Sequence, residues 1–159
     1  MVSAEPDGAS SSANAKQKPV SLTVQAALRL VARAEQCEAG ISRKLTLRRH
    51  PPPAIREALS YLVKNALVDD RRYARLWLKS RLAWSAKTPR MLVASLLARG
   101  IKSETAKASL AEALTPEVEK ELIRRLLAKK KLAVNTKTRA FLRCEGFSAG
   151  SIREAEEEP

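Results

Sequence analysis

The residues of this chain best suited to chemistry are its bases, because the usual catalytic sets are missing. The 159 residues include 30 Lys and Arg against 17 Asp and Glu, with one His. The nucleotide-binding patterns GxGxxG and GxxxxGK[ST] and the metal-binding patterns HExxH and CxxC do not occur. One His and two distant Cys leave no pair for nucleophilic catalysis. We therefore expect no enzyme and no cofactor, but a basic surface that attracts a polyanion or an acidic protein.

The remaining candidates for chemistry have simpler structural interpretations. His50 is interpreted as a packing residue at a helix end rather than as a ligand or base. Asp69 and Asp70 resemble a pair of metal-binding carboxylates, but adjacent residues point in different directions and arginines follow them, so we interpret them as helix caps. Trp77 and Trp84 are expected to pack within the fold, with stacking on bases or anchoring of an interface as the alternative.

The net charge of +13 is unevenly distributed along the chain. Twenty-two of the 30 bases lie in three windows that contain no acid, residues 39–56, 71–103 and 122–143. Residues 1–20 are neutral overall, and the end of the chain from Glu154 is acidic. One basic window is typical of a solvated helix face, whereas three of them favour a repeated unit with one basic side.

The elements that position these bases are predicted to be helices. Ala, Leu, Lys, Arg and Glu dominate from Ser21 onward, and aromatic residues make up only 4% of the chain. Residues 1–20 are rich in Ser, Ala and Pro without periodicity and are expected to form a disordered tail. Nine helices are predicted after it, with starts at Ser21 or Thr23, near Ala39, and at Pro53, Asp69 or Asp70, Thr88, Ser103, Thr115, Asn135 or Thr136, and Ala149.

The predicted helices fall into three groups of three. The segments 45–50, 96–101 and 142–147 align, at offsets of 51 and 46 residues. The second and third segments end in Gly and an apolar residue, whereas the first ends in Arg49-His50. We predict an all-α fold, an elongated array of three tandem three-helix repeats over residues 21–67, 68–114 and 115–159.

Bases within the acid-free windows are the candidate partner-binding residues. Arg72, Arg75 and Lys79 are spaced i, i+3, i+7 and form one stripe on a helix, away from Tyr73 and Trp77. The prediction concerns the whole set, which is Arg43, Lys44, Arg71, Arg72, Arg75, Lys79, Arg81, Lys87, Arg90, Lys129, Lys130 and Lys131.

Several segments, in the right order, resemble the RecX family. The segment ALRLVAR at 27–33 is similar to the family's opening helix. Three segments are similar to the second repeat of the family, VDDRRYAR at 68–75, KTPRM at 87–91 and LLARGI at 96–101. The segment FLRCEGFS at 141–148 is similar to the third repeat. Ala86 and Thr88 stand where the family usually has glycines, and Glu145 stands where Arg is common.

The resemblance implies a function as well as a fold. Members of the family are tandem three-helix-repeat proteins that bind the RecA recombinase filament. They inhibit its recombinase, ATPase and coprotease activities, and so modulate DNA repair, DNA recombination and the SOS response. The resemblance thus names RecA as the partner of the basic surface.

Other features predict where the protein works. The first 20 residues contain no apolar segment of a signal peptide, and no run of about 18 apolar residues could span a bilayer. We expect a cytoplasmic monomer without membrane contact, with Cys37 and Cys144 as free thiols; a disulfide between them is the alternative.

Two other functions fit the same charge pattern. A basic helical protein that binds DNA or RNA directly is one, because three-helix units also occur in helix-turn-helix domains. A ribosome-associated factor is the other. Direct binding to nucleic acid predicts a steep loss of affinity as salt rises.

Overall fold

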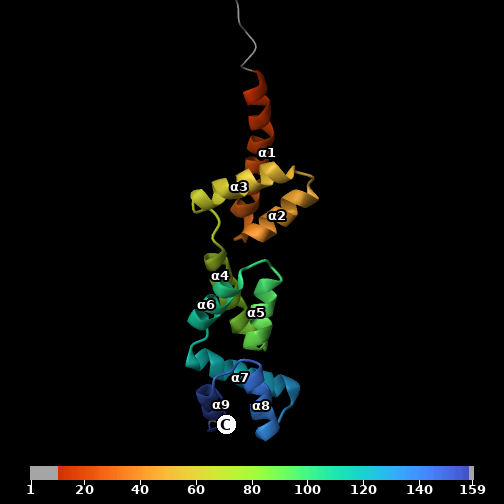
Figure 1. The fold of residues 1–159 in the computed structure, drawn as a ribbon. Coiled ribbons are helices and arrows are strands. Elements are labelled where there is room, and N and C mark those ends of the chain that lie inside the picture. Colours follow the sequence, from red (N-terminus) through yellow and green to blue (C-terminus); the bar gives the residue numbers. More distant parts are fainter. Residues whose placement is uncertain (1–10, 158–159) are drawn as a thin grey trace, which may run out of the picture. The chain divides into compact units, whose positions relative to one another are not determined.

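The part of the chain that the structure describes is built from helices alone. The computed structural model describes residues 11–157, with side chains from Leu22 onward. This confirms the all-α prediction for those residues. The helices, shown in Figure 1, are α1 Ser11–Arg33, α2 Glu38–Leu47, α3 Pro52–Lys64, α4 Asp70–Trp84, α5 Pro89–Leu97, α6 Ser103–Ala113, α7 Pro116–Lys130, α8 Thr136–Cys144 and α9 Ala149–Glu157.

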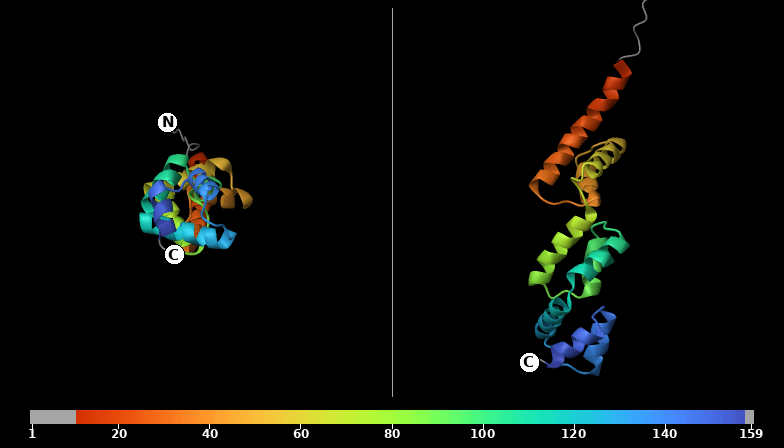
Figure 2. Two further views of the ribbon diagram at one scale, coloured as in Figure 1. Left: turned by 90° about the horizontal axis from the view of Figure 1, so that it is seen from below. Right: turned by 90° about the vertical axis from the view of Figure 1, so that its left-hand side faces the viewer.

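Consecutive helices pack in threes. Helices α1 and α2 both contact α3, α4 and α5 both contact α6, and α7 and α8 both contact α9 (Figure 2). We call these groups repeats 1, 2 and 3. The chain forms two compact units, Met1–Asp69 and Asp70–Pro159, so repeats 2 and 3 belong to one unit. The residue limits of the repeats and their elongated arrangement stay predictions.

The first helix starts earlier than the composition predicts. Residues 11–20 are helical, which corrects the predicted tail there, and residues 1–10 lie outside the described residues. Ala, Lys and Gln in this stretch are good helix formers and extend α1 toward the N-terminus. Thr23 therefore lies inside the helix and not at its cap. It is fully buried, and its hydroxyl is hydrogen-bonded to Nδ1 of His50 at 2.9 Å, in agreement with a packing role for His50.

Side chains cap three helices as predicted. Each cap accepts a hydrogen bond from the backbone N–H three residues later, which satisfies a donor that the helix leaves unpaired. The caps are Thr88 before α5, Thr115 before α7 and Asn135 before α8, with N···O distances of 3.3, 3.4 and 2.9 Å.

Two predicted helix starts are displaced by one residue. Ser103 is already helical in α6, and Lys102 precedes it as the cap residue without a side-chain hydrogen bond. Pro52 rather than Pro53 is the first residue of α3, after Pro51. A proline fits the first helical position because its missing N–H would have no partner there, so consecutive prolines leave the choice of first residue open.

The turn after the middle helix has the same geometry in all three repeats. Arg49, Gly100 and Gly146 all have positive φ angles, 61°, 89° and 94°. The next residue in each repeat donates its backbone N–H to the carbonyl five residues earlier, as in a Schellman motif. These bonds run from His50, Ile101 and Phe147 to Leu45, Leu96 and Leu142, at 3.1, 3.2 and 3.1 Å. The predicted alignment of the three segments is therefore confirmed, including Arg49 at the glycine position.

The buried face of α4 is not the aromatic face that the sequence favoured. Ala74, Leu78 and Leu82 are buried, whereas Leu76 is 51% exposed and Trp84 is 90% exposed. Helix α4 has apolar residues on two sides, and the side with the small Ala74 is the one buried in repeat 2, where α4 contacts α6. The prediction that Trp84 packs within the fold is wrong.

Candidate partner-binding surface

Five of the candidate bases lie on α4, the first helix of repeat 2. Arg75, Lys79, Arg71 and Arg81 are exposed, and Arg72 is half-buried. By the helical period, Arg72, Arg75 and Lys79 share the side of α4 opposite the aromatic residues. The structure thus leaves the predicted stripe accessible, next to the buried face.

Arg75 and Lys79 also line a groove in the unit formed by repeats 2 and 3. The groove has a volume of about 590 Å³. Its apolar lining consists of Leu82, Ala83, Ala113 and Val118, and its charged lining consists of Arg75, Lys79, Glu112, Glu117, Glu121 and Arg125. The groove therefore joins the end of α4 to the start of α7.

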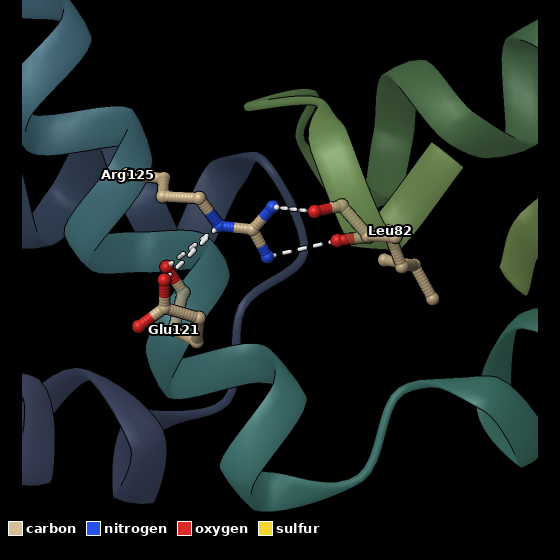
Figure 3. Close-up of polar contacts among 4 residues, drawn as sticks. Leu82, Glu121 and Arg125 are labelled. Carbon is tan, nitrogen blue, oxygen red and sulfur yellow. Dashed lines mark hydrogen bonds and ion pairs between the residues drawn. The ribbon is translucent and has the colours of Figure 1, made fainter. Parts of the chain in front are cut away.

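Arg125 of α7 connects the two sides of this groove, as Figure 3 shows. Its Nη2 donates to the carbonyl of Leu82 at 2.8 Å, and its Nη1 donates to the carbonyl of Ala83 at 3.1 Å. These carbonyls belong to the last turn of α4, where a helix leaves its acceptors unpaired. The Nε of Arg125 lies 3.3 Å from Glu121 Oε1. A base of repeat 3 thus completes a helix end of repeat 2.

The acids of the groove are already engaged within the chain. Glu112 forms an ion pair with Arg71, and Glu121 forms one with Arg125. The pKa of Glu117 lies below its ordinary value. Hydrogen bonds lower it, first from the backbone N–H of Glu117 itself and then from the hydroxyl of Thr115. The charge of Lys120 acts in the same direction, and slight desolvation opposes these effects. Glu117 lies in the first turn of α7, where a helix favours negative charge.

A second contact joins repeats 2 and 3 at the start of α5. The buried hydroxyl of Thr88 donates to Glu145 Oε2 at 2.5 Å, and the backbone N–H of Arg90 donates to the carbonyl of Glu145 at 3.1 Å. Two candidate bases flank this contact. Lys87 is half-buried, and Arg90 is exposed. They lie on the connection before α5 and on its first turn.

The side chain of Arg81 packs against an aromatic ring. Its guanidinium lies 5.5 Å from the ring centroid of Trp77, and the guanidinium of Arg99 lies 4.6 Å from the same centroid. Such cation–π contacts stabilise a half-exposed aromatic side chain. Trp77 thus packs as predicted, and Arg99, absent from the predicted set, contributes to the same cluster.

The three candidate lysines of repeat 3 lie at the end of α7 and are exposed. Lys130 Nζ lies 4.8 Å from the ring centroid of Phe141 and lines a pocket of about 470 Å³ with Lys137 and Phe141. Lys129 precedes it, and Lys131 has a left-handed backbone at the C-cap. These bases form a separate cluster within the same unit.

Arg43 and Lys44 are exposed on α2 in the other unit. Lys44 Nζ donates to Gln36 Oε1 at 2.7 Å. The structure therefore brings Arg75 and Lys79 together in one groove and distributes the other candidates among distinct places. The predicted set lacks Arg125, because nothing in the sequence distinguishes it from the other seven bases of its acid-free window. It also lacks the three groove acids, because they lie between two acid-free windows.

Several expectations about other sites can be checked in the described part. Cys37 is buried and Cys144 is exposed, and both are free thiols, as predicted. Among the described residues, no cluster of His, Cys, Asp or Glu has the make-up of a metal site. None of the described helices combines the length and apolar character that crossing a bilayer requires.

Comparison with known proteins identifies the family. A family model described as RecX, second three-helix domain, matches residues 69–110. Regulatory protein RecX of Mycobacterium sp. (strain JLS) is 36% identical over 85 residues, which are 54% of this chain and 46% of that protein, so the match spans about half of its length. Regulatory protein RecX of Mycobacterium leprae (strain Br4923) is 31% identical over 136 residues, which are 80% of this chain and 79% of that protein.

The fold is similar as well. A crystal structure of regulatory protein RecX superimposes with a TM-score of 0.78 at 23% identity, covering 99% of this chain and 83% of that one. Three observations agree with the motifs in repeats 2 and 3. They are an alignment over most of the length of a relative, a matching domain model and a common fold. The chain belongs to the RecX family.

Proposed function

We propose that this chain is a regulatory protein that binds the RecA recombinase filament and inhibits its recombinase, ATPase and coprotease activities. Through them it modulates DNA repair, DNA recombination and the SOS response. The observation that supports the proposal most directly is the group of bases on α4, from Arg71 to Arg81, within the segment that matches the family's second domain. Exposed bases favour a filament that contains DNA. The proposal includes a cytoplasmic monomer that needs no cofactor.

A titration of ATP hydrolysis by preformed RecA filaments on single-stranded DNA tests the proposal. The wild-type chain is expected to suppress hydrolysis at near-stoichiometric levels. The triple variant Arg72→Glu, Arg75→Glu, Lys79→Glu is expected to need about tenfold more protein for the same inhibition, because charge reversal opposes docking on an anionic surface. Full hydrolysis at saturating wild-type protein would contradict the proposal.

The matched control changes net charge equally elsewhere in the same unit. Lys102, Lys107 and Arg143 are exposed and lie outside the candidate set. Their triple substitution by Glu is expected to leave inhibition nearly unchanged. Equal losses in the two triple variants would attribute inhibition to net charge alone and remove the α4 stripe from the proposal. Circular dichroism of each variant checks that it folds.

A second candidate function, direct binding of DNA or RNA, is favoured by one specific observation. Trp84 is 90% exposed at the end of α4, and Arg81 lies one helical turn before it. Exposed aromatic rings beside bases stack on unpaired nucleotides. Tight binding to bare single-stranded DNA that falls steeply with salt, and that Trp84→Ala weakens, would support this function.

A further inference from the structure

We propose that the groove between α4 and α7 binds an acidic segment of a partner protein. A bulky apolar side chain of that segment enters the groove, and carboxylates of the same segment lie on either side of it. The inference rests on the proposed function and specifies the chemistry of the segment that the α4 surface recognises. The groove is lined by Arg75, Lys79 and Arg125 among its bases and by apolar side chains from both repeats.

The apolar lining favours a side chain rather than an ion alone. Leu82, Ala83, Ala113 and Val118 come from three different helices or their ends and face one space of about 590 Å³. This volume lies within the range of about 300–1,000 Å³ that is typical of ligand pockets. Burying an aromatic or branched side chain there would remove apolar surface of both partners from water.

The charges of the groove favour carboxylates on the incoming segment. Glu112 and Glu121 are paired with Arg71 and Arg125, and hydrogen bonds hold the carboxylate of Glu117 at the start of α7. Among the described residues, no acid forms an ion pair with Arg75 or Lys79. The two bases are therefore available to a carboxylate that arrives with the apolar side chain.

The same charges argue against nucleic acid as the occupant of this groove. Three glutamates alternate with the bases in its lining, so the groove offers no continuous basic wall to the evenly spaced charges of a phosphate backbone. An acidic peptide can place its few carboxylates against Arg75 and Lys79 on one wall and keep them away from Glu117 on the other. The groove is also contiguous with the Arg72–Arg75–Lys79 stripe, because Arg75 and Lys79 belong to both.

Fluorescence anisotropy with defined peptides tests the inference without any other protein. The probe is a fluorescein-labelled peptide with the core Asp-Asp-Phe-Asp-Asp. One comparison peptide has Ser in place of Phe, and another has Lys in place of each Asp. The full chain is expected to bind the probe about tenfold more tightly than either comparison peptide. Equal binding of the probe and either comparison peptide would overturn the proposal.

Two variants alter the groove in independent ways. Ala83→Trp fills it with a side chain from α4, and the double variant Arg75→Ala, Lys79→Ala removes its available bases. Each is expected to weaken probe binding about tenfold. The matched controls are Ala94→Trp, on an exposed position of α5, and the double variant Lys102→Ala, Lys107→Ala, at the exposed cap residue of α6 and at an exposed position within it. If the controls weaken binding as much as the groove variants, the site is elsewhere and the proposal fails.

The RecA ATPase titration then separates this inference from the proposed function. If both hold, Ala83→Trp weakens peptide binding and raises the concentration needed for inhibition, while Ala94→Trp changes neither. Specific peptide binding without any inhibition by the wild-type chain would contradict the proposed function and support the groove. Normal inhibition by Ala83→Trp would reject the groove as a filament contact and leave the proposed function standing. A labelled oligo-dT strand that binds the wild-type chain but not Ala83→Trp would overturn the choice of a protein segment.

Discussion

Two residues that depart from the family pattern, Thr88 and Glu145, contact each other. Thr88 stands where the family usually has Gly, and its hydroxyl both accepts the hydrogen bond that caps α5 and donates to Glu145. Glu145 stands where Arg is common, and an Arg side chain could not accept that hydrogen bond. The two departures are therefore best understood as one coupled change.

A double-mutant cycle on this pair measures the coupling. Thr88→Ala removes the cap and the contact, whereas Glu145→Ala removes only the contact. We expect a coupling free energy of about 1 kcal/mol in the free energy of unfolding, because the hydrogen bond joins a buried hydroxyl to a carboxylate. Urea denaturation of the single and double variants provides the values. Additive effects would show that the contact contributes nothing of its own.

The left-handed residue of repeat 1 predicts a stabilising substitution. Arg49 has φ 61°, a conformation that is unfavourable for residues with a Cβ, whereas repeats 2 and 3 have glycine there. Arg49→Gly is expected to raise the free energy of unfolding by about 1 kcal/mol. Its matched control is Arg48→Gly, which removes the same charge at φ −88° and should not stabilise. A gain from Arg48→Gly as large as that from Arg49→Gly would point to charge as the cause.

The pKa of Glu117 predicts part of the stability profile in acid. The folded pKa lies below the ordinary value of 4.5, so the folded state binds fewer protons than the unfolded state near that pH. The stabilisation is complete above 4.5 and is lost as pH falls through the folded pKa. Glu117→Gln should therefore lose less stability than the wild type on acidification, as followed by thermal unfolding at a series of pH values. Identical profiles would contradict this assignment.

At the scale of the helix, local chemistry was predictable and the choice of buried face was not. Thr88, Thr115 and Asn135 could be predicted as caps because a cap bonds to its own helix within three residues. The buried face of α4 depends on what packs against it, and both faces of this helix carry apolar residues. The bulk of Trp84 favoured the wrong face, since a large aromatic ring needs a partner surface as well as hydrophobicity.

Truncation of two leucines tests the observed face of α4. Leu78 is fully buried and Leu76 is 51% exposed, although they lie only two residues apart. Leu78→Ala is expected to lower the free energy of unfolding by about 2–5 kcal/mol, and Leu76→Ala by less than about 1 kcal/mol. Thermal or urea denaturation of the two variants measures the difference. Similar losses would support the aromatic face instead.

At the scale of the whole molecule, contacts between repeats 2 and 3 join these two predicted repeats into one unit. The sequence could locate three repeats because each has its own caps and turn. It could not predict the groove, because Arg75 and Val118 lie 43 positions apart in the sequence. Nor could it identify Arg125 among eight bases of the same acid-free window. The candidate site was therefore predictable as a set of bases, but not as a cavity with acids.

Removal of the Arg125 side chain tests how repeats 2 and 3 are joined. Arg125→Ala leaves the carbonyls of Leu82 and Ala83 without their guanidinium partner. We expect a loss of about 1–2 kcal/mol in the unfolding free energy of this unit and faster amide exchange in the last turn of α4. Peptides from α2 and α3, in the other unit, serve as the internal control in the exchange experiment. Unchanged exchange in α4 would contradict a stabilising role.

The long sequence separation of the Arg125 contact also affects the order in which the protein forms during synthesis. The carbonyls of Leu82 and Ala83 are made 43 and 42 residues before the guanidinium that binds them. A nascent chain that ends between these points has all of α4 but lacks the partner of its final turn. The end of α4 can therefore reach its mature hydrogen bonding only after α7 has left the exit tunnel, so translation itself delays completion of the second repeat.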